Sequence, residues 1–104
     1  MTDAQKRRVN QIRREAETFF KGSYEIKEFE VNENEFFVSV YVSIGVIGEN
    51  IYHKLILRIN AHIFIGPRGG MTIPVSRKLK NGEYKHYYKP YTSLIAADRE
   101  QNKL

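Results

Sequence analysis

The stretch Phe36–Ile44, FFVSVYVSI, decides the fold class because its side chains alternate between two sets. One set is apolar throughout, namely Phe36, Val38, Val40, Val42 and Ile44. The other set mixes rings with hydroxyls, namely Phe37, Ser39, Tyr41 and Ser43. Successive side chains of a strand point to opposite faces of a sheet, and β-branched residues favour strands. The stretch therefore predicts a strand with one face on a core, which requires further strands to pair with it.

The N-terminal segment, residues 1–22, predicts an amphipathic helix. Its apolar residues recur at the spacings of one helix face, namely Val9, Ile12, Ala16, Phe19 and Phe20. Thr2 and Gln5 have the spacing of a capping box, and Gly22 suits the residue that ends a helix. We expect this helix to pack on the sheet with its charged side chains in water.

Alternation of period two predicts four more strands, at residues 24–31, 51–65, 71–75 and 83–89. In the first of them the alternation separates Phe29 and Val31 from Ile26. Fifteen residues is long for one strand, so we expect a bend or bulge near Asn60–Ala61 in the second. Pro74 should confine its strand to a sheet edge or end it.

The last two strands and the C-terminus carry turn and cap signals. Asn81 followed by Gly82 is typical of a two-residue type I′ hairpin turn. Pro90 should stop the return strand, and Thr92 or Ser93 can cap a final helix. The predicted fold is α+β, with an N-terminal helix, a five-stranded mostly antiparallel meander and a C-terminal helix. We expect one domain over residues 1–104, with the first helix in 1–22, the sheet in 23–90 and the last helix in 91–104.

Composition excludes several classes of protein. The apolar fraction of 41% and the charged fraction of 28% are ordinary for a globular chain. No window of about 18 residues is apolar and free of charge, so we expect no transmembrane helix. The absence of cysteine excludes disulfides, thiolate metal sites and a cysteine nucleophile. These features favour a cytoplasmic protein that does not bind a membrane.

Positive charge is concentrated in two segments. Residues 1–22 carry six Lys/Arg against three acids, and residues 68–90 carry six against one. The segment between them is acidic, with three Lys/Arg against six acids. A local basic patch attracts polyanions, although a solvated surface that keeps the protein soluble is an equally ordinary explanation.

Residues 76–90, SRKLKNGEYKHYYKP, combine this charge with aromatic rings. Tyr84, His86 and Tyr88 share one strand face and Lys85, Tyr87 and Lys89 the other, so only one set can pack on the core. If Tyr84 and Tyr88 face the core, the other set forms an outward cationic and aromatic stripe. We expect this hairpin to bind nucleic acid through Arg68, Arg77, Lys78, Lys80, Lys85, Tyr87 and Lys89. A secondary basic patch on the first helix comprises Lys6, Arg7, Arg13 and Arg14.

Catalytic signals are weak. The histidines, His53, His62 and His86, stand apart on strand positions and match no catalytic or metal-binding motif. The loop at residues 66–70, GPRGG, is not a Walker A sequence, and no helix follows it. We therefore expect no catalysis, no metal and no cofactor.

The run IPVSRKLKNGEYKHYYKP, residues 73–90, resembles the motif of the stage V sporulation protein G (SpoVG) family. The matching residues are Gly82, Glu83, Tyr84, Lys85, Lys89 and Pro90. The chain departs from the family in its N-terminal helix, in one extra residue between Pro74 and Gly82, and in its GPRGG turn. The resemblance implies a dimeric sheet protein that binds DNA, with RNA left open as a further ligand, and that acts as a regulator without catalysis. It places the contacts on Arg77, Lys78, Lys80, Lys85 and Lys89, with the C-terminal helix close by.

Three hypotheses follow from the sequence. The leading one is a small regulator, homodimeric, that binds nucleic acid, with DNA favoured over RNA. The alternative is a phage- or mobile-element-encoded interaction module that docks on an acidic host protein. The third and weakest is a small enzyme, which would need His53 or His62 beside a carboxylate.

Overall fold

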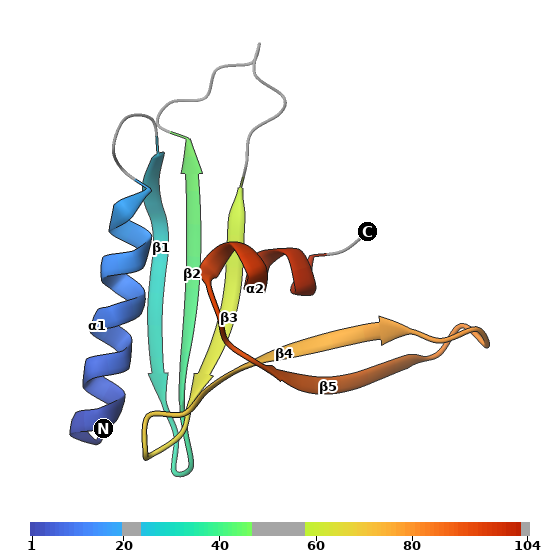
Figure 1. Ribbon diagram of the computed structural model, residues 1–104, viewed down its shortest axis with the longest axis horizontal. Coiled ribbons are helices and arrows are strands. Elements are labelled where there is room, and N and C mark those ends of the chain that lie inside the picture. Colours follow the sequence, from blue (N-terminus) through green and yellow to red (C-terminus); the bar gives the residue numbers. More distant parts are fainter. Residues whose placement is uncertain (20–23, 47–57, 103–104) are drawn as a thin grey trace.

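The computed structural model describes residues 1–19, 24–46 and 58–102. Along the chain these form α1 (Asp3–Thr18), β1 (Tyr24–Glu33), β2 (Val38–Val46), β3 (Ile59–Ile65), β4 (Met71–Lys78), β5 (Tyr84–Pro90) and α2 (Leu94–Gln101) (Figure 1). The strands form one sheet in chain order, and each neighbouring pair is antiparallel. The α+β prediction of a helix, a five-stranded meander and a second helix is confirmed.

Both helices pack on the same face of the sheet. Val9, Ile12 and Ala16 of α1 share one core with Leu94 and Ala97 of α2. The sheet contributes alternate residues to this core, namely Val38, Val40, Val42, Ile44, Ile59, Ala61, Ile63, Ile65, Ile73 and Val75. This confirms the two sets predicted within residues 38–44, whereas Phe36 precedes β2 and is 71% exposed. The opposite face of the sheet carries no helix among the described residues.

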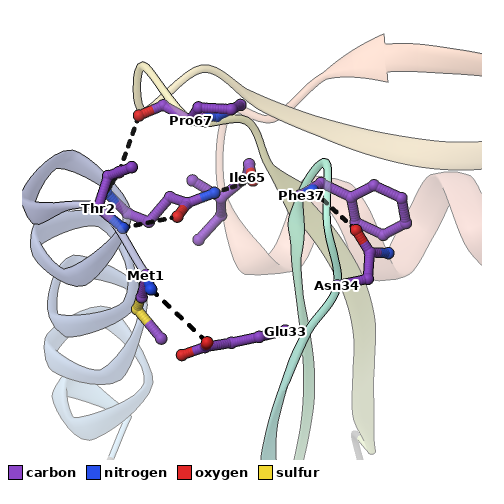
Figure 2. Close-up of polar contacts among 8 residues, drawn as sticks. Met1, Thr2, Glu33, Asn34, Phe37, Ile65 and Pro67 are labelled. Carbon is purple, nitrogen blue, oxygen red and sulfur yellow. Dashed lines mark hydrogen bonds and ion pairs between the residues drawn. The ribbon is translucent and has the colours of Figure 1, made fainter.

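The predicted helix caps are confirmed. The Thr2 side chain accepts a hydrogen bond from the Gln5 backbone N–H, and the Gln5 side chain accepts one from that of Thr2. Gln5 also donates to the carbonyl of Ile65 at 3.2 Å, and this buried bond ties α1 to β3 (Figure 2). Ser93 caps α2 by accepting from the Ala96 N–H at 3.1 Å. The proposed helix end at Gly22 lies outside the described residues.

Two expectations about strand irregularity were wrong. The β2–β3 register runs without a shift from Ile44 opposite Ile59 to Val38 opposite Ile65, so no bulge occurs near Asn60–Ala61. The described part of this strand is only seven residues long and needs no bend. The bulge lies instead in β1, between Ile26 and Glu28. An extra residue there reverses the alternation, so Ile26 packs against the core on the same face as Phe29.

The β4–β5 hairpin leaves the sheet soon after it begins. β3 and β4 pair only at Phe64 with Thr72 and at Ile65 with Met71. Among the described residues, β4 from Pro74 onward pairs with β5 alone, in agreement with the edge position predicted for this proline. The two strands therefore extend sideways as a ribbon, nearly crosswise to β1–β3 (Figure 1).

The C-terminal end of α2 lies along the edge of β3 that β4 leaves free. Gln101 accepts a hydrogen bond from the His62 N–H at 2.8 Å and donates to the His62 carbonyl at 2.7 Å. Asp98 accepts from the Asn60 N–H at 2.9 Å, and Asn102 donates to the Asn60 carbonyl at 2.9 Å. These side chains do what a neighbouring strand would do, because backbone groups in a sheet need partners.

Candidate functional site

The hairpin turn is one residue longer than predicted. Leu79 donates to the carbonyl of Glu83 at 2.7 Å, and Gly82 donates to that of Leu79 at 3.0 Å. The loop between Leu79 and Glu83 thus holds three residues, and Gly82 has a φ of 87°. A type I′ turn needs positive φ at both central residues, and Asn81 does not have it. The two-residue prediction was therefore wrong, and the geometry is that of a three-residue loop ending in a glycine.

This extra residue exchanges the two faces of β5. Lys78 stands opposite Tyr84 and Val75 opposite Tyr87, whereas a two-residue turn would have set Tyr88 opposite Val75. A one-residue shift in register moves each side chain to the other face. Tyr87 is consequently half-buried against the core, and Tyr84 and Tyr88 are 60% and 66% exposed. The predicted outward stripe of Lys85, Tyr87 and Lys89 lies instead on the helix side of the sheet.

Lys89 has a partner within the protein. Its ammonium group lies 3.0 Å from a carboxylate oxygen of Glu100 in α2. The hydrogen bond to Glu100 raises the pKa of Lys89 above its usual value, while partial burial acts in the opposite direction. The structure thus gives Lys89 a role in holding α2 beside β5.

The outer part of the hairpin, residues 76–86, is called the hairpin arm below. Its four exposed cations are Arg77, Lys78, Lys80 and Lys85. Arg77 stands directly opposite Lys85, and like charges at such positions destabilise a strand pair. Within the described part of the chain, none of the four makes an ion pair. A bound polyanion would relieve this repulsion.

Arg68 lies far from the hairpin arm. Its loop is docked on α1, where Thr2 donates to the carbonyl of Pro67 at 2.8 Å (Figure 2). Arg8 donates to the carbonyl of Gly69 at 3.0 Å. Arg68 shares a hollow with Arg7 and Arg8 of α1. The prediction that placed Arg68 beside the cations of the hairpin does not match this position. This end of α1 and the tip of the arm lie on opposite sides of the molecule (Figure 1).

The secondary basic patch predicted on the first helix is exposed. Its members Lys6, Arg7, Arg13 and Arg14 all lie on the surface of α1. The Arg13 guanidinium stands 4.1 Å from the centre of the Phe29 ring, which is a cation–π contact. Arg8, which the prediction omitted, joins Thr2 in fastening this end of the chain to the loop that holds Arg68.

The face of the sheet that the helices leave uncovered is called the open face below. Alternation from the core residues assigns to it five aromatic side chains, namely Phe37, Tyr41, His62, Phe64 and Tyr88. Sequence analysis placed Phe37 and Tyr41 off the core face but did not connect them with the other three. That connection depends on the strand pairing and on the hairpin register, which local pattern does not determine.

His62 does not lie in a catalytic arrangement within the described residues. Its ring stacks against Tyr41 with centroids 4.6 Å apart. It lines a cleft of about 440 Å³ between β3 and the hairpin, together with Asn60, His86 and Tyr88. No carboxylate is among the described residues that line this cleft. His53, the other candidate, falls outside the described residues.

Searches for a metal site and a membrane span found no candidate in residues 1–19, 24–46 and 58–102. No three His, Asp or Glu side chains there are grouped as metal ligands would be. Neither helix is long and apolar enough to cross a bilayer. Comparison of the chain with family models, curated proteins and solved structures finds no match. The resemblance to the SpoVG family stays a prediction.

Proposed function

We propose that the protein binds nucleic acid through its hairpin arm and performs no catalysis. One observation carries the proposal. The arm holds four exposed cations on a two-stranded ribbon that projects from the sheet, and two of them, Arg77 and Lys85, face one another. Such a cluster costs stability in the free protein, so a role in binding a polyanion accounts for it.

The shape of the arm supports a nucleic-acid ligand. A projecting two-stranded ribbon can follow a nucleic-acid backbone, and its exposed Lys and Arg side chains can bind phosphates in a single strand as well as in a duplex. Tyr84 and His86 add exposed rings between the cations, and rings can stack on bases. We further propose a cytoplasmic, homodimeric regulator, with DNA as the favoured ligand over RNA. The likeness of residues 73–90 to the SpoVG motif agrees with this assignment.

The salt dependence of binding tests the proposal. Each phosphate contact contributes about 0.9 to the slope of log K against log salt for duplex DNA, and about 0.7 for a single strand. A variant with Arg77, Lys78 and Lys85 changed to alanine should therefore flatten the slope by about 2 to 3. A matched control changes Lys6, Arg7 and Arg14, which lowers the net charge equally on the far side of the molecule.

The outcomes separate the possible assignments. Equal flattening by both triple variants would mean that net charge, or the basic patch on α1 together with the arm, sets the salt dependence, and would remove the arm as the sole site. No binding of any probe at low salt would refute a nucleic-acid ligand. In that case, capture of one acidic protein that survives nuclease treatment and is lost in the arm variant would establish the alternative partner.

A further inference from the structure

The open face joins one cation of the hairpin arm, Lys78, to a row of aromatic rings, while Arg77 and Lys85 stand on the other side of the two-stranded ribbon. We infer that these rings are a stacking platform for unpaired bases, so the ligand is single-stranded nucleic acid rather than a duplex. The inference rests on the proposed function, because the arm supplies the phosphate contacts. The inference adds that the open face recognises the unpaired bases of the same ligand.

The rings form a continuous row across strands that are distant in sequence. Phe37 and Phe64 have centroids 4.9 Å apart, and Phe64 and Tyr88 have centroids 5.9 Å apart. The row therefore runs from the start of β2 through β3 to β5. Tyr41 and His62 form a second contact beside it, at 4.6 Å. The two ring pairs are tilted by 58° and 54°, so each ring covers part of its neighbour, and unpaired bases would stack on the parts of the row that stay exposed, Tyr88 above all.

The row is held in place and accessible. The Asn34 side chain accepts a hydrogen bond from the N–H of Phe37 (Figure 2). It also accepts one from the N–H of Phe36, and the two bonds fix the start of β2. Phe37 and Phe64 are half-buried by their neighbours, while Tyr88 is 66% exposed. Preformed rings lose little conformational freedom on binding, which favours affinity.

The surface around the row is suited to bases rather than to phosphates. An apolar hollow beside the rings is lined by Phe37, Phe64, Met71, Tyr88 and Pro90. An aromatic row with an apolar hollow is a poor match for the outer surface of a duplex, which presents phosphates and sugars. Unpaired bases expose the flat apolar surface that such a hollow accepts.

The charges at the two borders of the row indicate how a strand would lie. On the arm side the same face continues with Lys78 and the exposed rings of Tyr84 and His86. On the other side β1 presents the carboxylates of Glu28 and Glu30, the latter directly opposite Tyr41. Phosphates are attracted to the first border and repelled by the second. A ligand that fits both the cationic border and the ring row must carry negative charge and exposed aromatic rings. A single-stranded nucleic acid has both.

The test compares single-stranded with duplex probes, and the wild-type protein with a variant that lacks the Tyr88 ring. Labelled oligothymidine and oligouridine of about 12 nucleotides, within the usual range of site sizes, are titrated by fluorescence anisotropy beside a duplex of equal length. Either single strand should bind at least about tenfold more tightly than the duplex, and the comparison of the two single strands shows which of these two probes is preferred. Tyr88→Leu should weaken single-strand binding about tenfold without altering the salt slope, because it removes stacking and no phosphate contact.

The matched control is Phe36→Leu. Phe36 is 71% exposed and stands just before β2, outside the row, so the same loss of a ring should leave affinity unchanged. Phe64→Leu serves as a second variant within the row, with circular dichroism to confirm that each variant is folded.

Three results would overturn the inference, and each differs from failure of the proposed function. Preference for the duplex, with loss of binding in the arm variant, would keep nucleic-acid binding and remove the platform. Unchanged affinity in folded Tyr88→Leu and Phe64→Leu variants would do the same. A dimer that dissociates in Tyr88→Leu during sedimentation, with binding unaffected, would assign the open face to a second copy of the chain.

Discussion

Replacing Glu15 by alanine should weaken the attachment of α2 to α1. One carboxylate oxygen of Glu15 accepts from the Tyr91 hydroxyl, and the other accepts from the N–H of Leu94 at 2.7 Å. Leu94 is the first residue of α2, and the first N–H groups of a helix have no partner within it. A single side chain on one helix therefore anchors the start of the other.

The magnitude follows from these two hydrogen bonds. Each bond to a charged group contributes about 1.5 to 3 kcal/mol when well shielded. Glu15 and Tyr91 are only half-buried, so water can replace part of the interaction and the loss should be about 2 to 4 kcal/mol. This is a large share of the 5 to 15 kcal/mol or so that stabilises a typical domain. Glu15→Gln keeps one acceptor oxygen and should lose about 1 kcal/mol.

Urea unfolding followed by circular dichroism measures these differences. The control is Glu17→Ala, which makes the same change on the same helix at an exposed position. A double-mutant cycle with Tyr91→Phe should give a coupling energy of about 1 kcal/mol or more, since the two side chains touch. A Glu15→Ala variant as stable as the Glu17→Ala control, or a coupling energy near zero, would refute the reasoning.

Two further predictions concern glycine and tyrosine. Gly69→Ala should destabilise the fold more than Gly82→Ala. Both glycines have positive φ, but only at position 69 would an added Cβ lie against other atoms, nearest the Ala4 Cβ at 3.3 Å. The urea midpoints of the two variants check this, and equal losses of stability would contradict it. Burial, aided by the hydrogen bond to Glu15, raises the pKa of Tyr91. The folded state therefore keeps this proton when the unfolded state releases it, so stability should fall as pH rises above about 10. Tyr91→Phe should reduce that fall, and an identical alkaline profile in wild type and variant would count against it.

Local sequence rules were sufficient to predict features that depend only on residues close together in the chain. Thr2 with Gln5, and Ser93 ahead of Leu94, capped helices where the sequence predicted. The alternation of residues 38–44 was enough to separate core from open face, because every apolar member is β-branched. Such signals involve few residues, and no tertiary contact overrides them here.

The candidate site depended on the number of residues in the hairpin loop, which sets the strand register and which local sequence rules do not determine. Asn81–Gly82 has the composition of a two-residue turn, yet the loop takes three residues and only Gly82 adopts positive φ. Val75 offered a check, because the residue opposite it must also face the core, and that residue is Tyr87. The contact of Lys89 with Glu100 and the separation of Arg68 from the arm arise from packing between distant segments. No pattern in the sequence encodes those distances.

The position of α2 accounts for the arrangement of both proposed binding surfaces. Asp98, Gln101 and Asn102 hydrogen-bond to the backbone of β3 at Asn60 and His62, where no described residue of β4 pairs with it, and the hairpin leaves the sheet beyond Thr72. The hairpin then carries Tyr88 to the end of the aromatic row while its tip extends the cations away from the sheet. The cleft of about 440 Å³ lies at the junction, lined by Tyr88 of the row, by Tyr41 and His62 beside it, and by Gln101 and Asn102. In the proposed binding mode, a nucleic-acid strand that runs from Tyr88 to the hairpin arm passes along this cleft, and α2 forms part of its wall.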